Sequence, residues 1–328
     1  MRPFEPSWLL PGPHLPTIWG KKARRQKRMH DRVECVETPD GDHLTLARMG
    51  RPAASVQQIL ILHGLEGTIG AKYAHGLLAQ AQARGWTGTL MLFRSCDGQL
   101  NSAPRLYHSG ETTDLDFIVR RLHAESPLSP LFICGVSLGG NVLLKWLGER
   151  SQATTMVTGA AAVSVPFDLA RGSRYLELGF SRLYAAHFLQ TLKTKALAKA
   201  RQFPGRMDDH RIRAATTFWE FDDAATAPLH GFLDAADYYE RSSSIHYLSG
   251  IQVPTLLFSA FDDPFVPPDV LRDAGRIAAS NPSIVCDFSE RGGHVGWVEG
   301  SLWPATYYME ARVVEFFAKV HQPHTKVL

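Results

Sequence analysis

Short apolar runs alternate along the chain with longer stretches in which apolar residues recur every three or four positions. The short runs are typical of strands buried on both faces of a parallel sheet, and the longer stretches are typical of amphipathic helices. The runs lie at Val56–Leu62, Thr89–Phe93, Leu131–Gly135, Gly159–Ser164, Pro254–Ser259 and Ser283–Phe288, and the helical patterns lie near 71–85, 111–124, 138–150, 268–280 and 303–320. This alternation predicts an α/β protein with a mostly parallel sheet and helices on both of its faces.

Two further strands and a proline-rich segment are expected before this alternation begins. The strands are Val33–Glu37 and Leu44–Arg48, and they flank Pro39-Asp40-Gly41-Asp42. An Asp-Gly pair favours a hairpin turn, so the two strands should pair and bring the sheet to eight strands. Residues 1–32 are rich in proline and basic residues and are predicted to form an N-terminal arm.

The interval between the sixth and seventh apolar strands departs from the pattern. Residues 166–249 show helical patterns, aromatic residues and charges but no strand. Because the interval is far longer than an ordinary connecting loop, it is interpreted as a helical cap inserted into one α/β domain. The chain then divides into the arm at 1–32, a first core part at 33–165, the cap at 166–249 and a second core part at 250–328.

The composition narrows the class of protein. Of the 328 residues 45% are hydrophobic and 20% are charged, which excludes a disordered or fibrous chain. Lysine and arginine exceed aspartate and glutamate only by 35 to 32, so no nucleic-acid partner is expected. No apolar run is long enough for a membrane span. The four cysteines lack CxxC spacing and no HExxH occurs, so we expect reduced thiols, no metal and a cytoplasmic protein.

The sharpest chemical signal is Gly135-Val136-Ser137-Leu138-Gly139-Gly140, which directly follows an apolar strand and precedes a helical pattern. In that context G-x-S-x-G is typical of a nucleophile elbow, a tight turn that exposes the serine hydroxyl and needs neighbours almost without side chains. Ser137 is therefore the candidate nucleophile, and the Leu138 N–H is a candidate oxyanion-hole donor. A serine in an ordinary glycine-rich turn is the alternative, which the flanking strand and helix disfavour.

A serine nucleophile needs a histidine base and a carboxylate that orients it, in the order Ser, acid, His for α/β-hydrolases. Asp262 and Asp263 follow one downstream strand, and His294 follows the next within a glycine-rich loop. Either aspartate could be the acid; Asp263 is favoured because it begins the pattern D-x-x-V-P, and Asp262 would then cap the turn. The alternative for His294 is a surface histidine in a glycine loop.

The second oxyanion-hole donor is expected from the loop that follows the strand Val56–Leu62, and Leu65 N–H in His63-Gly64-Leu65-Glu66-Gly67 fits that position. His63 is expected to brace this loop rather than to act as a second base. The glycines here and Lys72 match neither GxxxxGK[ST] nor GxGxxG, so nucleotide binding is not expected. The predicted chemistry requires no cofactor.

Taken together, these motifs resemble the YheT-like α/β-hydrolases, bacterial relatives of the eukaryotic α/β-hydrolase-domain lipid esterases. The resemblance extends over most of the chain and includes His14-Leu15-Pro16-Thr17-Ile18-Trp19, HGLEG at 63–67, Phe93-Arg94-Ser95-Cys96-Asp97-Gly98, the elbow GVSLGGN, Glu220-Phe221-Asp222-Asp223, Asp237-Tyr238-Tyr239, Asp262-Asp263-Pro264-Phe265 and Gly292-Gly293-His294-Val295-Gly296. It implies an α/β-hydrolase fold and a Ser–Asp–His esterase with catalytic roles on Ser137, Asp263 and His294. The chain departs from the family at Ser95, where a glycine is common.

Four other features bear on function, and three of them have two interpretations. The basic run from Lys21 to Arg28 could contact an anionic membrane surface weakly, but it is interpreted first as a solvated arm. Arg94 could contact a substrate anion or pair with an acidic neighbour. The exposed face of a cap helix is predicted to carry Lys193, Lys195, Lys199 and Arg201. The acyl pocket or the core of the cap is predicted to contain Phe218, Trp219, Phe221, Tyr238 and Tyr239.

The predicted reaction is hydrolysis of a small-molecule carboxylic ester with a short to medium acyl chain, through an acyl-enzyme. An acyltransferase or thioesterase would use the same acyl-enzyme, and sequence does not separate these from an esterase. The third alternative is a non-catalytic binding protein with this fold, which the presence of Ser137, Asp263 and His294 disfavours. The sequence leaves the oligomeric state open.

Overall fold

The centre of the protein is an eight-stranded sheet with the strand order β1-β2-β4-β3-β5-β6-β7-β8. The computed structural model describes residues 2–150 and 153–321. Within this sheet β2 runs antiparallel to both of its neighbours, and every pair from β4 to β8 is parallel. The strands are β1 (Arg32–Glu37), β2 (His43–Met49), β3 (Gln58–Leu62), β4 (Thr87–Leu92), β5 (Leu131–Val136), β6 (Gly159–Val163), β7 (Thr255–Ala260) and β8 (Ile284–Ser289).

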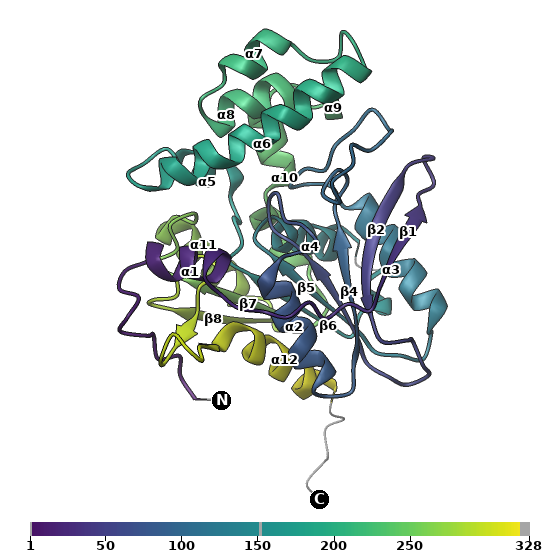
Figure 1. Cartoon of the computed structure of the whole chain (residues 1–328), viewed down its shortest axis with the longest axis vertical. Coiled ribbons are helices and arrows are strands. Elements are labelled where there is room, and N and C mark those ends of the chain that lie inside the picture. The colour runs from purple at the N-terminus through teal and green to yellow at the C-terminus, as the bar shows by residue number, and fades with distance from the viewer. Residues whose placement is uncertain (1, 151–152, 322–328) are drawn as a thin grey trace, which may run out of the picture.

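Helices cover both faces of the sheet (Figure 1), three packing on one face and two on the other. The first face carries α3 (Thr113–Glu125), α4 (Leu138–Glu149) and α11 (Pro268–Ala278), and the second carries α2 (Lys72–Gln82) and α12 (Tyr308–His321). Along β3, Leu60 and Leu62 belong to the first core, whereas Ile59 and Ile61 belong to the second. Because β3 to β7 are buried on both faces, these strands are mostly apolar, which makes them recognisable in the sequence as apolar runs.

The predicted α/β-hydrolase fold is confirmed, and all eight strands and five core helices lie where the apolar pattern put them, within a few residues. The largest difference concerns α12, which begins at Tyr308 rather than near residue 303. Residues before it pair instead as a short hairpin of β9 (Val298–Glu299) and β10 (Thr306–Tyr307).

The N-terminal arm contains a helix that the sequence pattern did not predict, α1 (His14–Lys22). Prolines stand at 11, 13 and 16, and proline disrupts the interior of a helix. However, Pro13 precedes the helix and Pro16 lies in its first turn, where the backbone N–H has no partner within the helix in any case. The prolines therefore fix the start of α1 rather than prevent it.

A helical cap occupies the described chain between β6 and β7. Figure 1 shows α6 to α9 gathered at the top of the molecule, apart from the sheet. The cap comprises α5 (Leu169–Tyr175), α6 (Ser181–Gln202), α7 (Asp209–Ala214), α8 (Phe218–Phe221), the π-helical turn η2 (Asp222–Thr226), α9 (Ala227–His230), α10 (Ala235–Ser242) and the 3-10 segment η3 (Ser244–Gly250). Leu189, Ile212 and Phe221 belong to an apolar core of its own.

Two lysines of α6 fasten the cap to the sheet domain. Lys199 is fully buried, and its Nζ donates to the carbonyl oxygens of Asn101 (2.5 Å) and Ala103 (2.9 Å). Lys195, one turn earlier, pairs with Glu66. The prediction that both lysines belong to a solvent-exposed helix face is therefore wrong, because periodicity cannot reveal that a neighbouring loop supplies carbonyl and carboxylate acceptors.

Two further properties of the described chain bear on the sequence expectations. Within residues 2–150 and 153–321, no helix combines the length and the apolar character needed to cross a membrane. All four cysteines are unpaired, with Cys96 and Cys134 buried and Cys35 and Cys286 exposed. The expectation of reduced thiols agrees with this arrangement.

Candidate active site

Ser137 lies at the tight turn between β5 and α4. Its φ of 54° and ψ of −120° are rare for a residue with a side chain and indicate local strain. The Ser137 N–H donates to the carbonyl oxygen of Val163 at 2.8 Å, which ties the turn to the neighbouring strand β6. The turn leaves the side chain half-buried at the wall of a cavity, beside the free N–H groups at the start of α4. This is the geometry of a nucleophile elbow.

The glycines around Ser137 are required because other backbone segments approach them closely. A Cβ on Gly135 would lie 2.4 Å from the Gly139 carbonyl oxygen, and a Cβ on Gly139 would lie 2.6 Å from the carbonyl oxygen of His63. A Cβ on Gly64 would lie 3.1 Å from that of Ser137. The loop that carries Leu65 therefore packs directly against the elbow.

Asp263 and His294 are brought together from the ends of β7 and β8. His294 Nδ1 lies 2.9 Å from Asp263 Oδ2 and 3.1 Å from Oδ1. Asp263 is fully buried, and its Oδ1 also accepts from the N–H of Phe265 at 2.8 Å, whose ring stacks on the His294 imidazole with centroids 4.2 Å apart. Asp262 accepts instead from Gly293 N–H at 2.8 Å, so it braces the histidine loop. Of the two aspartates, Asp263 is the one in contact with the imidazole.

Helix α1 supports the His294 loop, a role that the sequence patterns did not show. The hydroxyl of Thr17 accepts from the His294 N–H at 2.9 Å and donates to the carbonyl oxygen of Pro13 at 2.7 Å. A Cβ on Gly293 would lie 2.5 Å from that same carbonyl oxygen. The N-terminal segment is therefore part of the site's framework.

His63 braces the 63–67 loop, as predicted. Its ring is fully buried, Nε2 accepts from the Phe93 N–H at 3.1 Å, and Nδ1 contacts the Gly64 carbonyl oxygen at 2.7 Å. These partners fit the neutral tautomer with a proton on Nδ1, and burial lowers the pKa of His63 to about 4. A neutral, enclosed imidazole holds the loop in place and does not reach a substrate.

Glu66, in the same loop, connects it to the cap. Its φ is 54°, and its N–H donates to the Tyr107 hydroxyl at 2.9 Å. The Glu66 carboxylate accepts from Tyr107 Oη and from Lys195 Nζ, both at 2.7 Å. Because Glu66 directly follows Leu65, this ion pair couples the position of α6 to the loop that carries the candidate oxyanion-hole donor.

A cavity of about 600 Å³ extends from the elbow into the cap, within the size range of small-molecule sites. Ser137, His294, Leu65 and Leu138 all line it. The cap contributes Phe218, Phe221, Tyr238 and Tyr239, which are also buried in the cap core. The cap-core interpretation is therefore confirmed for these four aromatics, and their role in an acyl pocket stays a prediction. Trp219 is outside the lining and packs on Tyr239. In the chain from 2 to 150 and 153 to 321, no group of three or more His, Cys, Asp or Glu side chains is arranged to hold a metal ion.

One buried carboxyl group lines the cap side of the cavity. Asp222 accepts from the Tyr239 hydroxyl at 2.7 Å and from the Thr226 hydroxyl at 2.5 Å. Burial raises the pKa of Asp222 to about 6. Asp222 and Tyr239 belong to two of the motifs on which the family resemblance rests, and the structure joins them by this hydrogen bond.

Replacing Asp222 by asparagine should stabilise the protein at neutral pH but not near pH 4. The pKa of Asp222 is raised from 3.8 to about 6 in the folded chain, so the carboxylate lowers stability progressively as pH rises through that window. The pKa shift corresponds to roughly 3 kcal/mol in the free energy of unfolding at neutral pH. The gain in D222N should be smaller than this, because asparagine accepts hydrogen bonds less well from the hydroxyls of Tyr239 and Thr226. Urea unfolding between about pH 4 and pH 7 measures this. Asp237→Asn, at a partly exposed carboxyl whose pKa is lowered, is the control, and a pH-independent gain in D222N would contradict the expectation.

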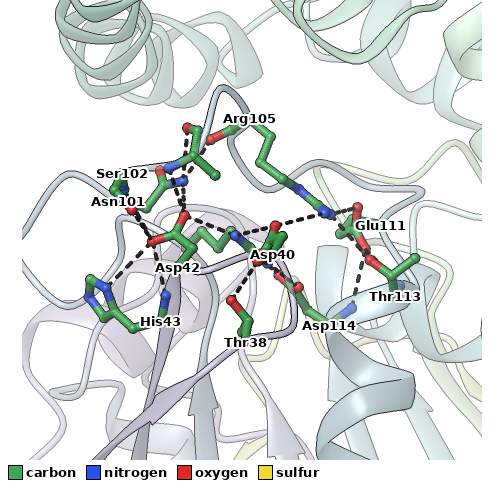
Figure 2. Close-up of polar contacts among 12 residues, drawn as sticks. Thr38, Asp40, Asp42, His43, Asn101, Ser102, Arg105, Glu111, Thr113 and Asp114 are labelled. Carbon is green, nitrogen blue, oxygen red and sulfur yellow. Dashed lines mark hydrogen bonds and ion pairs between the residues drawn. The ribbon is translucent and has the colours of Figure 1, made fainter.

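Arg94 pairs with acidic neighbours and does not line the cavity. Its guanidinium contacts Asp114 at 2.7 and 2.8 Å, Asp42 at 2.9 Å and Asp40 at 3.0 Å. Figure 2 shows this network, in which Asp42 also accepts from the Asn101 side chain at 2.7 Å. Although burial opposes ionisation, the hydrogen bonds from the Asn101 side chain and from the backbone N–H groups of Ala103 and Ser102 hold the pKa of Asp42 well below its usual range. The interpretation that Arg94 pairs with acids is confirmed.

The loop after Arg94 explains the departure from the family at Ser95. Ser95 has a φ of 61°, a conformation that glycine adopts without steric cost. Here the Ser95 hydroxyl donates to Asn101 Oδ1 at 2.7 Å and accepts from the Asn101 N–H at 3.1 Å. These two hydrogen bonds offset the backbone strain that the side chain introduces.

The basic run is only partly a solvated arm. Arg24 is buried, pairs with the buried Glu310 of α12, and lies over the ring of Tyr307. Lys21 lines the cavity and lies 5.2 Å from the centroid of the Phe188 ring. The prediction of a solvated run is wrong for Arg24, because Glu310 and the ring of Tyr307 enclose its guanidinium, whereas the side chain of Lys21 is exposed beside the cavity.

Comparison with known proteins gives concordant results for sequence and fold. Residues 58–295 match a family model described as the alpha/beta hydrolase fold. The chain is 37% identical over 307 residues to the inferred esterase YheT of Escherichia coli (strain K12), covering 92% of this chain and 89% of the relative. It is 28% identical to phospholipase ABHD3 of Mus musculus, covering 95% and 79% of the two chains. A solved Pyrococcus furiosus esterase superposes with a TM-score of 0.58 at 17% identity, covering 89% and 91%.

Proposed function

Because this chain belongs to the YheT-like branch of the alpha/beta hydrolase family, we propose that it is a serine carboxylesterase with Ser137, Asp263 and His294 as its triad. The chain is a hydrolase of ester bonds, as its esterase, phospholipase and lipase relatives are. One observation carries the assignment of residues: the buried Asp263 holds the imidazole of His294 at the wall of the same cavity that Ser137 lines.

In the proposed reaction His294 Nε2 removes the proton of the Ser137 hydroxyl as Oγ attacks the ester carbonyl carbon. Asp263 keeps the proton of the imidazole on Nδ1 and stabilises the imidazolium that forms. The Leu65 and Leu138 N–H groups donate to the oxyanion of the tetrahedral intermediate. His294 then protonates the leaving alcohol and afterwards activates the water that releases the acid from Ser137.

The cavity supports an ester with a short to medium acyl chain. Its wall in the cap is built from apolar and aromatic side chains, including Phe218, Phe221 and Leu229. Tyr107 and Lys195 add polar groups near the elbow, although Lys195 is neutralised by Glu66. We further propose a cytoplasmic enzyme, which the four unpaired cysteines support.

The proposal is tested by labelling the protein with a fluorophosphonate probe and by measuring hydrolysis of p-nitrophenyl esters of increasing acyl length. We expect stoichiometric labelling at Ser137, located by peptide mass spectrometry, and the highest kcat/KM for short to medium chains. Labelling at another serine would contradict the nucleophile. Faster transfer of the acyl group to an added alcohol or thiol than to water would identify an acyltransferase instead.

A further inference from the structure

Two helices from distant parts of the sequence lie side by side at the entrance of the cavity. The ring of His14 in α1 lies 4.6 Å from that of Phe180, directly before α6, and its Nδ1 is 3.4 Å from the Tyr184 hydroxyl. Seven residues further along α1, the ammonium group of Lys21 lies over the ring of Phe188 in α6. Side chains of α1 and α6 that are exposed and also line the cavity, such as Ile18 and His187, mark this side of its opening.

Large apolar side chains are exposed along this rim. We define the collar as Leu15, Ile18, Leu178, Phe180, Leu183 and Trp303, whose exposed fractions range from 36% to 63%. Leu15 and Ile18 are three residues apart on α1, so they share one face. Trp303 joins that face through Trp19, 4.8 Å away between ring centroids. Single exposed apolar residues are common, but a contiguous group marks a surface that contacts something apolar.

The collar lies in a positively charged environment. Residues 14–28 contain six lysines and arginines and no acidic residue. Only Arg24 among them has an acidic partner in the described chain. On α6 the exposed Arg182 adds a charge, and Glu177 is the nearby acid in the preceding loop. Apolar side chains surrounded by cations match a surface that is anionic outside and apolar inside, namely a bilayer with anionic lipids.

We propose that the collar docks this protein on anionic lipid surfaces, with the cavity opening toward the lipid. Two copies of the chain docking through the same face would bring Lys21 and Lys22 of each copy close to those of the other, which disfavours self-association. Docking goes beyond the esterase activity and does not depend on it. In this arrangement an ester reaches Ser137 from the lipid without first dissolving in water.

The test is co-sedimentation of the full chain, carrying Ser137→Ala to prevent turnover, with vesicles of phosphatidylcholine alone or mixed with phosphatidylglycerol. We expect binding to the anionic vesicles that weakens as salt rises, because salt screens the lysines and arginines. Leu15→Ser with Leu183→Ser should lower the affinity at least about tenfold, since complete burial of a single leucine is itself worth about that factor.

The matched control is Leu128→Ser with Leu233→Ser, which makes the same change at leucines that are 77% and 91% exposed outside the collar. This control should bind vesicles as the parent chain does. With Ser137 intact, L15S/L183S should hydrolyse a soluble p-nitrophenyl ester at the parent rate, so that failure of docking and failure of the esterase proposal are distinguishable. Absence of vesicle binding, equal loss in both double variants, or a dimer in solution that only L15S/L183S dissociates would overturn the proposal.

Discussion

The Ser137→Ala variant should lose at least about 10⁴-fold in kcat for p-nitrophenyl ester hydrolysis, because no other group can form the acyl-enzyme. The substitution removes only Oγ, and the Cβ that packs near Gly64 remains. The oxyanion-hole donors and the His294–Asp263 pair would stay in place, so substrate binding should change far less than turnover. Steady-state kinetics with an active-site titration of the parent enzyme measures the effect.

Two comparisons separate loss of the nucleophile from a general disturbance of the site. The S137A protein should unfold at the same temperature as the parent. Alanine, like serine, carries a Cβ, so both residues bear the same backbone strain at φ 54°. Ser173→Ala makes the same chemical change in another serine that lines the cavity, whose hydroxyl donates to the Ala170 carbonyl oxygen, and it should retain most of the activity. If S137A keeps a tenth of the activity, or still reacts with a fluorophosphonate, the nucleophile is elsewhere.

The parts of this site that sequence could predict are those set by local backbone geometry. The glycines around Ser137 are visible because the elbow excludes side chains, and Asp263 and His294 are visible because each follows an apolar strand. At the carboxyl ends of neighbouring parallel strands such residues converge on one edge of the sheet. The positions of the strands along the chain and of the cap interval required only the spacing of apolar runs.

The parts that sequence could not predict depend on contacts between distant segments. Nothing near Thr17 indicates that its hydroxyl accepts from the N–H of His294, 277 positions away. Lys199 shows the same limit: four residues from Lys195 on one helix, it resembles an exposed charge until the loop at 101–103 surrounds it with carbonyl oxygens. Whether a charged side chain can be buried depends on the groups that contact it, and helical periodicity carries no information about those groups.

Arg94→Met should destabilise the protein by about 3–5 kcal/mol, because it leaves two buried carboxylates without their cation. The side chains of Asp42 and Asp114 are 0% and 4% exposed, and Arg94 bridges them. Asp42 would keep its hydrogen bonds from Asn101 and from backbone N–H groups. Burial already raises the pKa of Asp114. Because the variant also removes its cation, Asp114 should take up a proton. Urea unfolding at neutral pH measures the loss.

A second substitution at Asp114 tests whether its uncompensated charge causes the loss of stability in R94M. Adding Asp114→Asn removes the uncompensated carboxylate, so the double variant should be more stable than R94M alone, and the double-mutant cycle should give a coupling of about 1 kcal/mol or more. Arg120→Met is the matched control, since the Arg120 side chain, which pairs with Asp116 on α3, is 56% exposed, and ion pairs at the surface contribute little. Equal destabilisation by R94M and R120M, or additive effects of R94M and D114N, would show that Arg94 does not compensate the buried charge of Asp114.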